Sequence, residues 1–132
     1  VPHHPYIYDQ ATGDFSPEKE TSYIDNLVLA DRTLGEVRKE MEGAGVWDDS
    51  IILITADHGL KTSRNGRSLG RGNVPFLLKL PHQRETFVCP TSFVTVLIPD
   101  LIVKLLQDKQ IDPDSVVAWI GQSPWVRSRI EH

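Results

Sequence analysis

The residues with the clearest chemical potential lie at the end of the stretch 51–59, which reads Ile-Ile-Leu-Ile-Thr-Ala-Asp-His-Gly. Its uninterrupted apolar run predicts a strand that is buried on both faces of a parallel sheet. In open α/β sheets, ligands bind beyond the carboxyl ends of the strands, where Asp57 and His58 fall. A carboxylate and an imidazole can share one divalent cation, and Gly59 lets the backbone turn so that both face one centre. The alternative is an ordinary turn after a strand, with Asp57 capping the next element.

Length and composition indicate a globular protein. The chain has 132 residues, of which 39% are hydrophobic and 24% charged, and we expect a single unit spanning residues 1–132. A formal net charge of −4 gives no electrostatic case for nucleic acid or an anionic membrane. No apolar run approaches the roughly 20 residues of a membrane span. The single cysteine leaves the compartment undetermined.

The spacing of apolar and turn-forming residues predicts helices and strands in alternation. Ser16 as N-cap and Pro17 in the first turn indicate the start of a long amphipathic helix that ends near Gly43. Strands are expected over 51–54 and 74–81, with a third short strand over 85–88. A second helix is expected from Pro99, and a short last helix over 114–120 with Asp114 or Ser115 as its cap.

The order of these pieces resembles the C-terminal portion of the catalytic domain in the sulfatase family, within the alkaline-phosphatase superfamily. The matching stretches are Pro2-His3-His4-Pro5-Tyr6, Tyr23-Ile24-Asp25-Asn26, Asp31, Leu34-Gly35, Gly45-Val46-Trp47-Asp48-Asp49-Ser50-Ile51-Ile52, Thr55-Ala56-Asp57-His58-Gly59 and Val74-Pro75-Phe76. The resemblance implies part of an α/β/α sandwich with a mostly parallel sheet. Because the chain opens at Val1 without an initiator Met or a leader, we expect this fold to be truncated at its N-terminus.

The resemblance also implies a chemistry. Members of the family cleave sulfate or phosphate esters, with a covalent nucleophile held beside a divalent cation that lowers its pKa and neutralises charge on the transferring group. The Asp-His pair of the family supplies two ligands to that cation, and it corresponds here to Asp57 and His58. The residues imply one cation, which could be calcium, manganese or zinc.

Residues that would bind the anionic ester are implied less directly. The histidine of the family's Pro-His motif corresponds to His3, with His4 as the neighbouring alternative. The family places a lysine before its Val-Pro strand, and the equivalent loop here offers Lys61, Arg64 and Arg67. The alternatives are that the histidines cap a proline-rich loop and that the arginines are solvated.

The family's nucleophile is missing from these residues. Cys89 lies in the sequence Cys-Pro-Thr-Ser-Phe, which lacks the family's Cys-x-Pro/Ala-x-Arg pattern and follows the metal pair instead of preceding it. We interpret Cys89 as a small buried hydrophobe. The two-metal branch of the superfamily would need an Asp-x-x-x-His pair, but the residues four places after Asp9 and Asp14 are Gly13 and Glu18.

The sequence therefore predicts a fragment of a metal-dependent sulfuric- or phosphoric-ester hydrolase that is inactive alone. The rival interpretation is a non-catalytic α/β module that binds a partner or acts as a scaffold. A truncated domain should also leave apolar surface uncovered. We expect the helix face with Leu27, Leu34 and Val37 to drive self-association.

Overall fold

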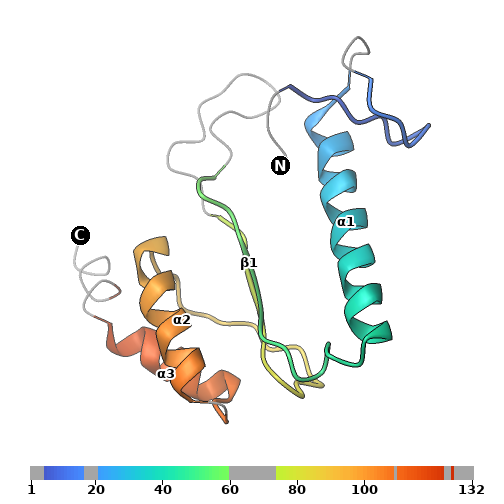
Figure 1. Cartoon of the computed structure of the whole chain (residues 1–132). Helices are drawn as coiled ribbons and strands as arrows, with labels where there is room; N and C mark the ends of the chain where they lie inside the picture. Colours follow the sequence, from blue (N-terminus) through green and yellow to red (C-terminus); the bar gives the residue numbers. More distant parts are fainter. Residues whose placement is uncertain (1–4, 17–20, 60–73, 109, 124–125, 127–132) are drawn as a thin grey trace. The chain divides into compact units, whose positions relative to one another are not determined.

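The computed structural model describes residues 5–16, 21–59, 74–108, 110–123 and 126. The chain divides into two compact units, Val1–Asp48 and Asp49–His132. The first unit contains helix α1 (Tyr23–Gly43). The second contains strands β1 (Ile52–Thr55) and β2 (Phe76–Lys79), the 3-10 turn η1 (Thr95–Leu97), and helices α2 (Ile98–Gln107) and α3 (Pro113–Gln122) (Figure 1).

Helix α1 begins with a capping box. The Ser22 amide donates to Asp25 Oδ2 at 2.7 Å, and the Asp25 amide donates to Ser22 Oγ at 3.3 Å. These two bonds satisfy backbone donors that the first helical turn leaves without partners. The predicted start at Ser16 is wrong, because the extended Ser22 is the N-cap. The predicted end is confirmed, since α1 stops at Gly43.

An ordered loop over residues 5–16 packs against the N-terminal part of α1 (Figure 1). The Tyr8 amide donates to Oδ1 of the buried Asn26 at 3.3 Å, and the Tyr8 hydroxyl contacts the Arg32 guanidinium. Tyr8 also forms an isolated antiparallel bridge with Phe15. Asn26 is the buried helical residue that holds this loop.

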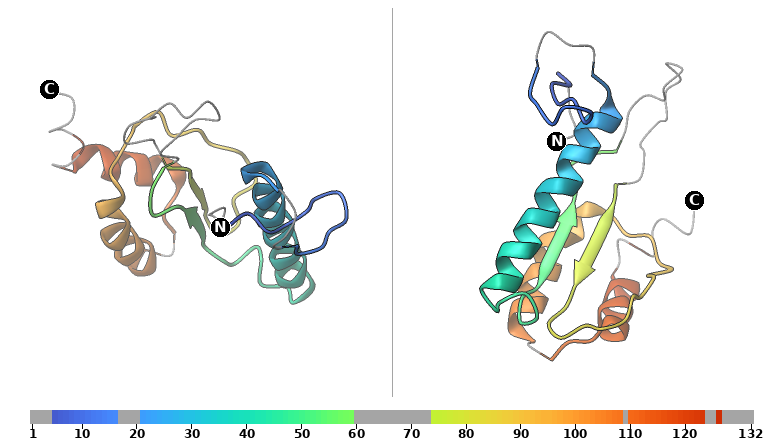
Figure 2. Two further views of the ribbon diagram at one scale, coloured as in Figure 1. Left: turned by 90° about the horizontal axis from the view of Figure 1, so that it is seen from above. Right: turned by 90° about the vertical axis from the view of Figure 1, so that its right-hand side faces the viewer.

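Strands β1 and β2 form a two-stranded antiparallel sheet, which Figure 2 shows side by side and running in opposite directions. The register pairs Ile52 with Lys79 at one end and Thr55 with Phe76 at the other. The predicted α/β/α sandwich with a mostly parallel sheet is therefore wrong, because the described residues contain three helices and only this sheet. An apolar run such as 51–54 cannot by itself distinguish parallel from antiparallel pairing. All four residues of β1 are only half-buried, as suits a strand with a single neighbour.

One face of this sheet packs on the core that α2 and α3 provide. Leu53, Phe76 and Leu78 lie against that core, whereas Leu77 is 58% exposed, as the two-residue period of a strand requires. The core residues of this unit are Leu80, Leu97, Leu101, Leu105, Ile111, Val116, Ile120 and Val126.

The helices of the second unit largely follow prediction. Pro99 lies in the first turn of α2, as expected, but the cap of α3 is Asp112, whose side chain accepts from the Ser115 amide at 2.7 Å. Residues 85–88 form no strand, contrary to prediction. Among the described helices, none has the length and apolar character needed to cross a membrane.

Candidate metal centre at the end of β1

Asp57 and His58 lie just beyond β1, separated from Thr55 by Ala56, and local contacts orient both side chains. The His58 amide donates to Asp57 Oδ1 at 3.0 Å, which fixes the carboxylate beside the next residue. His58 Nδ1 lies 3.0 Å from the Gly59 carbonyl oxygen. Because a carbonyl only accepts, this contact requires a proton on Nδ1, and the lone pair of the neutral ring is then on Nε2. The backbone around Gly59 thus selects the tautomer that presents Nε2.

The carboxylate and the imidazole converge. His58 Nε2 lies 3.9 Å from Asp57 Oδ2, and the two side chains are 46% and 91% exposed respectively. That separation is too long for a hydrogen bond. Two metal–ligand bonds of about 2.1 Å each can span it, so a single cation fits between these atoms. This separation is compatible with the expected shared centre, which stays a prediction.

Asp57 and His58 are two candidate ligands, and the described residues add no third beside them. No group of three or more His, Cys, Asp or Glu side chains that could hold a metal occurs among the described residues. Five predicted substrate-binding residues lie outside the described residues, so the structure does not place them: His3, His4, Lys61, Arg64 and Arg67.

A second Asp–His pair lies at the other end of the same sheet. His82 Nε2 is 3.2 Å from Asp49 Oδ1, with side chains 69% and 73% exposed. Continuing the register beyond Ile52 and Lys79 places Asp49 opposite His82. The predicted parallel pairing does not bring these two residues together, whereas the antiparallel register does.

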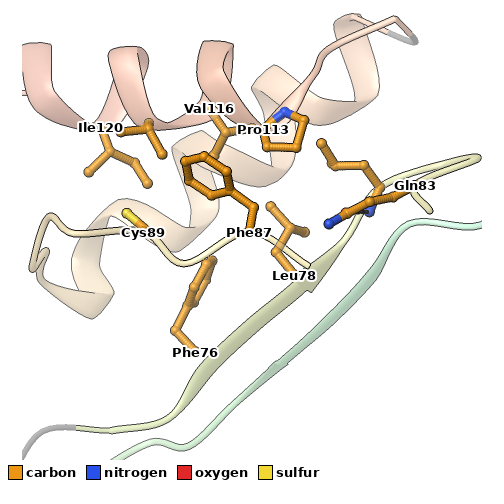
Figure 3. Close-up of a pocket in the computed structure, with 10 residues that line it drawn as sticks. Phe76, Leu78, Gln83, Phe87, Cys89, Pro113, Val116 and Ile120 are labelled. Carbon is orange, nitrogen blue, oxygen red and sulfur yellow. Dashed lines mark hydrogen bonds between the residues drawn. The ribbon is translucent and has the colours of Figure 1, made fainter. Parts of the chain in front are cut away.

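Described residues of the second unit line cavities, two of which bear on its possible functions. The first, of about 100 Å³, lies between β2, the segment that follows it, and α3 (Figure 3). Leu78, Phe87 and Ile120 contribute to its mainly apolar lining, and Gln83 is its one amide side chain among the described residues. This cavity is too small and too apolar for an anionic ester, so it does not extend the candidate metal centre.

Cys89 lines both cavities and is half-buried. Its Sγ lies 3.5 Å from the Thr91 carbonyl oxygen, to which the thiol donates. The prediction of a small buried hydrophobe is thus only partly met, since the thiol has a polar contact and some exposure.

Comparison with known proteins gives no relative for this chain. No protein-family model matches it, and neither the curated proteins nor the solved structures yield a match.

Proposed function

We propose that Asp57 and His58 are two ligands of one divalent cation in a hydrolase of sulfuric or phosphoric esters. The observation that carries this proposal is the 3.9 Å separation of Asp57 Oδ2 and His58 Nε2 at the end of β1. The Gly59 carbonyl, 3.0 Å from Nδ1, supports it because second-shell acceptors of this kind orient metal-binding histidines. The ordered motifs of the sequence supply the class of reaction.

Each group would have a separate task. Asp57 would contribute a negative oxygen and His58 a neutral nitrogen, a donor set compatible with manganese, zinc or calcium. The bound cation would lower the pKa of a nucleophile and offset charge on the transferring group. The nucleophile and the remaining ligands would come from outside these 132 residues. The side chains proposed to contact the anionic ester are His3, His4, Lys61, Arg64 and Arg67.

Hydrolysis of 4-nitrophenyl sulfate and 4-nitrophenyl phosphate tests this proposal. The assay uses the protein together with whatever its reading frame encodes before residue 1, with manganese, zinc or calcium added. Replacing Asp57→Ala should lower kcat/KM by at least about tenfold, because a metal ligand is lost. Asp49→Ala is the matched control and should leave kcat/KM unchanged. Absence of metal uptake by the unmutated protein would defeat the enzymatic interpretation.

The rival function is a non-catalytic module that binds a partner or acts as a scaffold. The apolar face of α1 that we expect a truncated domain to leave uncovered does not separate the two functions: Leu27, Leu34 and Val37 are 44%, 43% and 50% exposed, and a scaffold could also present such a face. We propose that this face drives self-association. Leu34→Glu should then shift the protein toward monomer in size-exclusion chromatography. A wild-type protein that remains a clean monomer at high concentration would contradict self-association.

A further inference from the structure

The larger cavity of the second unit has a lining unlike that of the candidate metal centre. It has a volume of about 480 Å³ and lies between the start of β2 and the segment over residues 86–98. Hereafter it is the hydroxyl-lined cavity. Its volume falls within the range of about 300–1,000 Å³ that is typical of small-molecule sites. The cavity is therefore large enough for a molecule of two fused rings.

Aromatic rings form part of the wall. Phe76 and Phe93 meet edge to face, with ring centroids 4.6 Å apart and planes at 86°. Phe87 also lines the cavity and is 44% exposed, and its neighbour Val88 is 82% exposed. Aromatic side chains in this arrangement offer both ring faces and ring edges to another ring. Exposed apolar side chains gathered around a hollow are typical of ligand sites.

Hydroxyl groups complete the lining. They belong to Thr55, Thr86, Thr91, Ser92 and Thr95. Thr55 Oγ1 is buried and has no hydrogen-bond partner among the described residues. Because an unpaired buried hydroxyl costs free energy, a ligand oxygen that reached Thr55 would relieve that cost.

The described lining carries no formal charge. Every described residue that lines the cavity is apolar or bears a hydroxyl or thiol. A charged ligand would lose its hydration there without gaining a counter-charge from these residues. An uncharged ring with a hydrogen-bonding substituent meets no such penalty.

We infer that the hydroxyl-lined cavity binds an uncharged aromatic molecule that carries at least one hydroxyl group. The ring of this molecule packs against the phenylalanines, and its hydroxyl forms hydrogen bonds with the threonine and serine side chains. Neither Asp57 nor His58 lines this cavity, so binding there can be measured separately from metal binding at the proposed centre.

Binding of 2-naphthol to the full chain tests the inference, with 2-naphthalenesulfonate as the charged counterpart. Affinity is measured by equilibrium dialysis. The rate of Cys89 alkylation by iodoacetamide, followed by mass spectrometry, reports occupancy because Cys89 lines the cavity and is the single cysteine of the chain. We expect 2-naphthol to bind at least about tenfold more tightly than the sulfonate and to slow alkylation.

Two variants separate the cavity from general apolar surface. Thr86→Trp places a large side chain at the exposed lining residue Thr86 and should weaken 2-naphthol binding by about tenfold or more. Leu106→Ser alters a side chain that is 70% exposed on α2 and lines neither cavity, so binding should be unchanged. Circular dichroism checks that both variants fold. Equal binding of the sulfonate, unprotected Cys89, or 2-naphthol binding that survives Thr86→Trp in a folded protein would overturn the inference.

Discussion

The two Asp–His pairs lie at opposite ends of one antiparallel sheet, and they are built differently. Asp57 and His58 are neighbours in sequence, with Nε2 and Oδ2 3.9 Å apart. Asp49 precedes β1 and His82 follows β2, and Oδ1 of Asp49 lies 3.2 Å from Nε2 of His82. The shorter distance is that of a direct ion-pair contact between the two side chains, whereas the longer one leaves space for a bridging ion. The two pairs therefore differ in the distance between their side chains, and the proposed cation concerns only the more widely separated pair.

The backbone conformations at the two ends reinforce this contrast. His82 has a φ of 55°, in the left-handed region that few non-glycine residues adopt. At the same end, Lys79 Nζ donates to the Ser50 carbonyl at 3.0 Å, so several contacts tie the chain together there. At the other end, Asp57 is 91% exposed and its partner is the next residue. One pair is held by the register of the sheet, and the other by a local turn.

Both Asp–His pairs flank a sheet that packs on the core of the second unit. Removing part of that core is expected to have the largest effect on stability. Leu101 is fully buried on α2, so Leu101→Ala should lower the free energy of unfolding of the second unit by about 2–5 kcal/mol. Ile102→Ala is the neighbouring control, at a side chain 43% exposed, and should cost much less. Urea unfolding followed by circular dichroism measures both. Equal losses from the two substitutions would show that the core is wrongly assigned.

The sequence predicted the parts of this unit that depend on local pattern. The apolar spacing after Pro99 fixed α2, and the run over 51–54 located β1, because both signals lie within a few residues. The predicted direction of strand pairing was wrong, because this direction depends on contacts between segments far apart in the chain. The N-cap of α1 could have been predicted, because Ser22 and Asp25 have the spacing of a capping box. Ser16-Pro17 also has the pattern of a helix start, and it placed the predicted start too early in the chain.

At the candidate metal centre too, the features set by local sequence were predictable and those set by other contacts were not. Adjacency in sequence was enough to bring Asp57 and His58 together at the end of β1. The contact of Nδ1 with the Gly59 carbonyl was not predictable, because it depends on the torsion angles of a short turn. The Asp49–His82 pair needed the register, which composition and periodicity do not specify.

The capping box of α1, in the first unit, is another contact between residues close in sequence. Ser22→Ala removes the acceptor for the Asp25 amide and should cost about 0.5–2 kcal/mol in helix stability. Hydrogen exchange of the first-turn amides of α1 measures the loss. Amides of the second unit should keep their protection, because the change is local. Unchanged exchange at the start of α1 would contradict the assigned cap.

The acid stability of α1 should follow the same capping box. Hydrogen bonds from the Ser22 side chain and backbone hold the pKa of Asp25 below its ordinary value of 3.8. The stabilisation is therefore present above pH 3.8 and is lost as the pH falls through the lower, folded-state pKa. NMR titration of the Asp25 carboxyl should give a depressed pKa, and Asp25→Asn should remove this part of the acid dependence. A titration at or above the ordinary value would refute the assignment.

The smallest expected effect concerns the Asp49–His82 contact. Both side chains are largely exposed, so their coupling free energy should be only about 0.2–1 kcal/mol and should decline with added salt. A double-mutant cycle of Asp49→Ala and His82→Ala by urea unfolding measures it. No coupling at low ionic strength would indicate that the contact does not form in solution.

The contrast between the two pairs is tested most directly by titrating Mn²⁺, Zn²⁺ and Ca²⁺ calorimetrically into the 132-residue chain and its variants. Two ligands alone bind weakly, so the wild-type affinity should be modest. At least one of these ions should bind wild type and Asp49→Ala alike, and Asp57→Ala or His58→Ala should weaken that binding by about tenfold or more. Equal binding by wild type and Asp57→Ala, or a loss confined to Asp49→Ala, would contradict a metal centre at the end of β1.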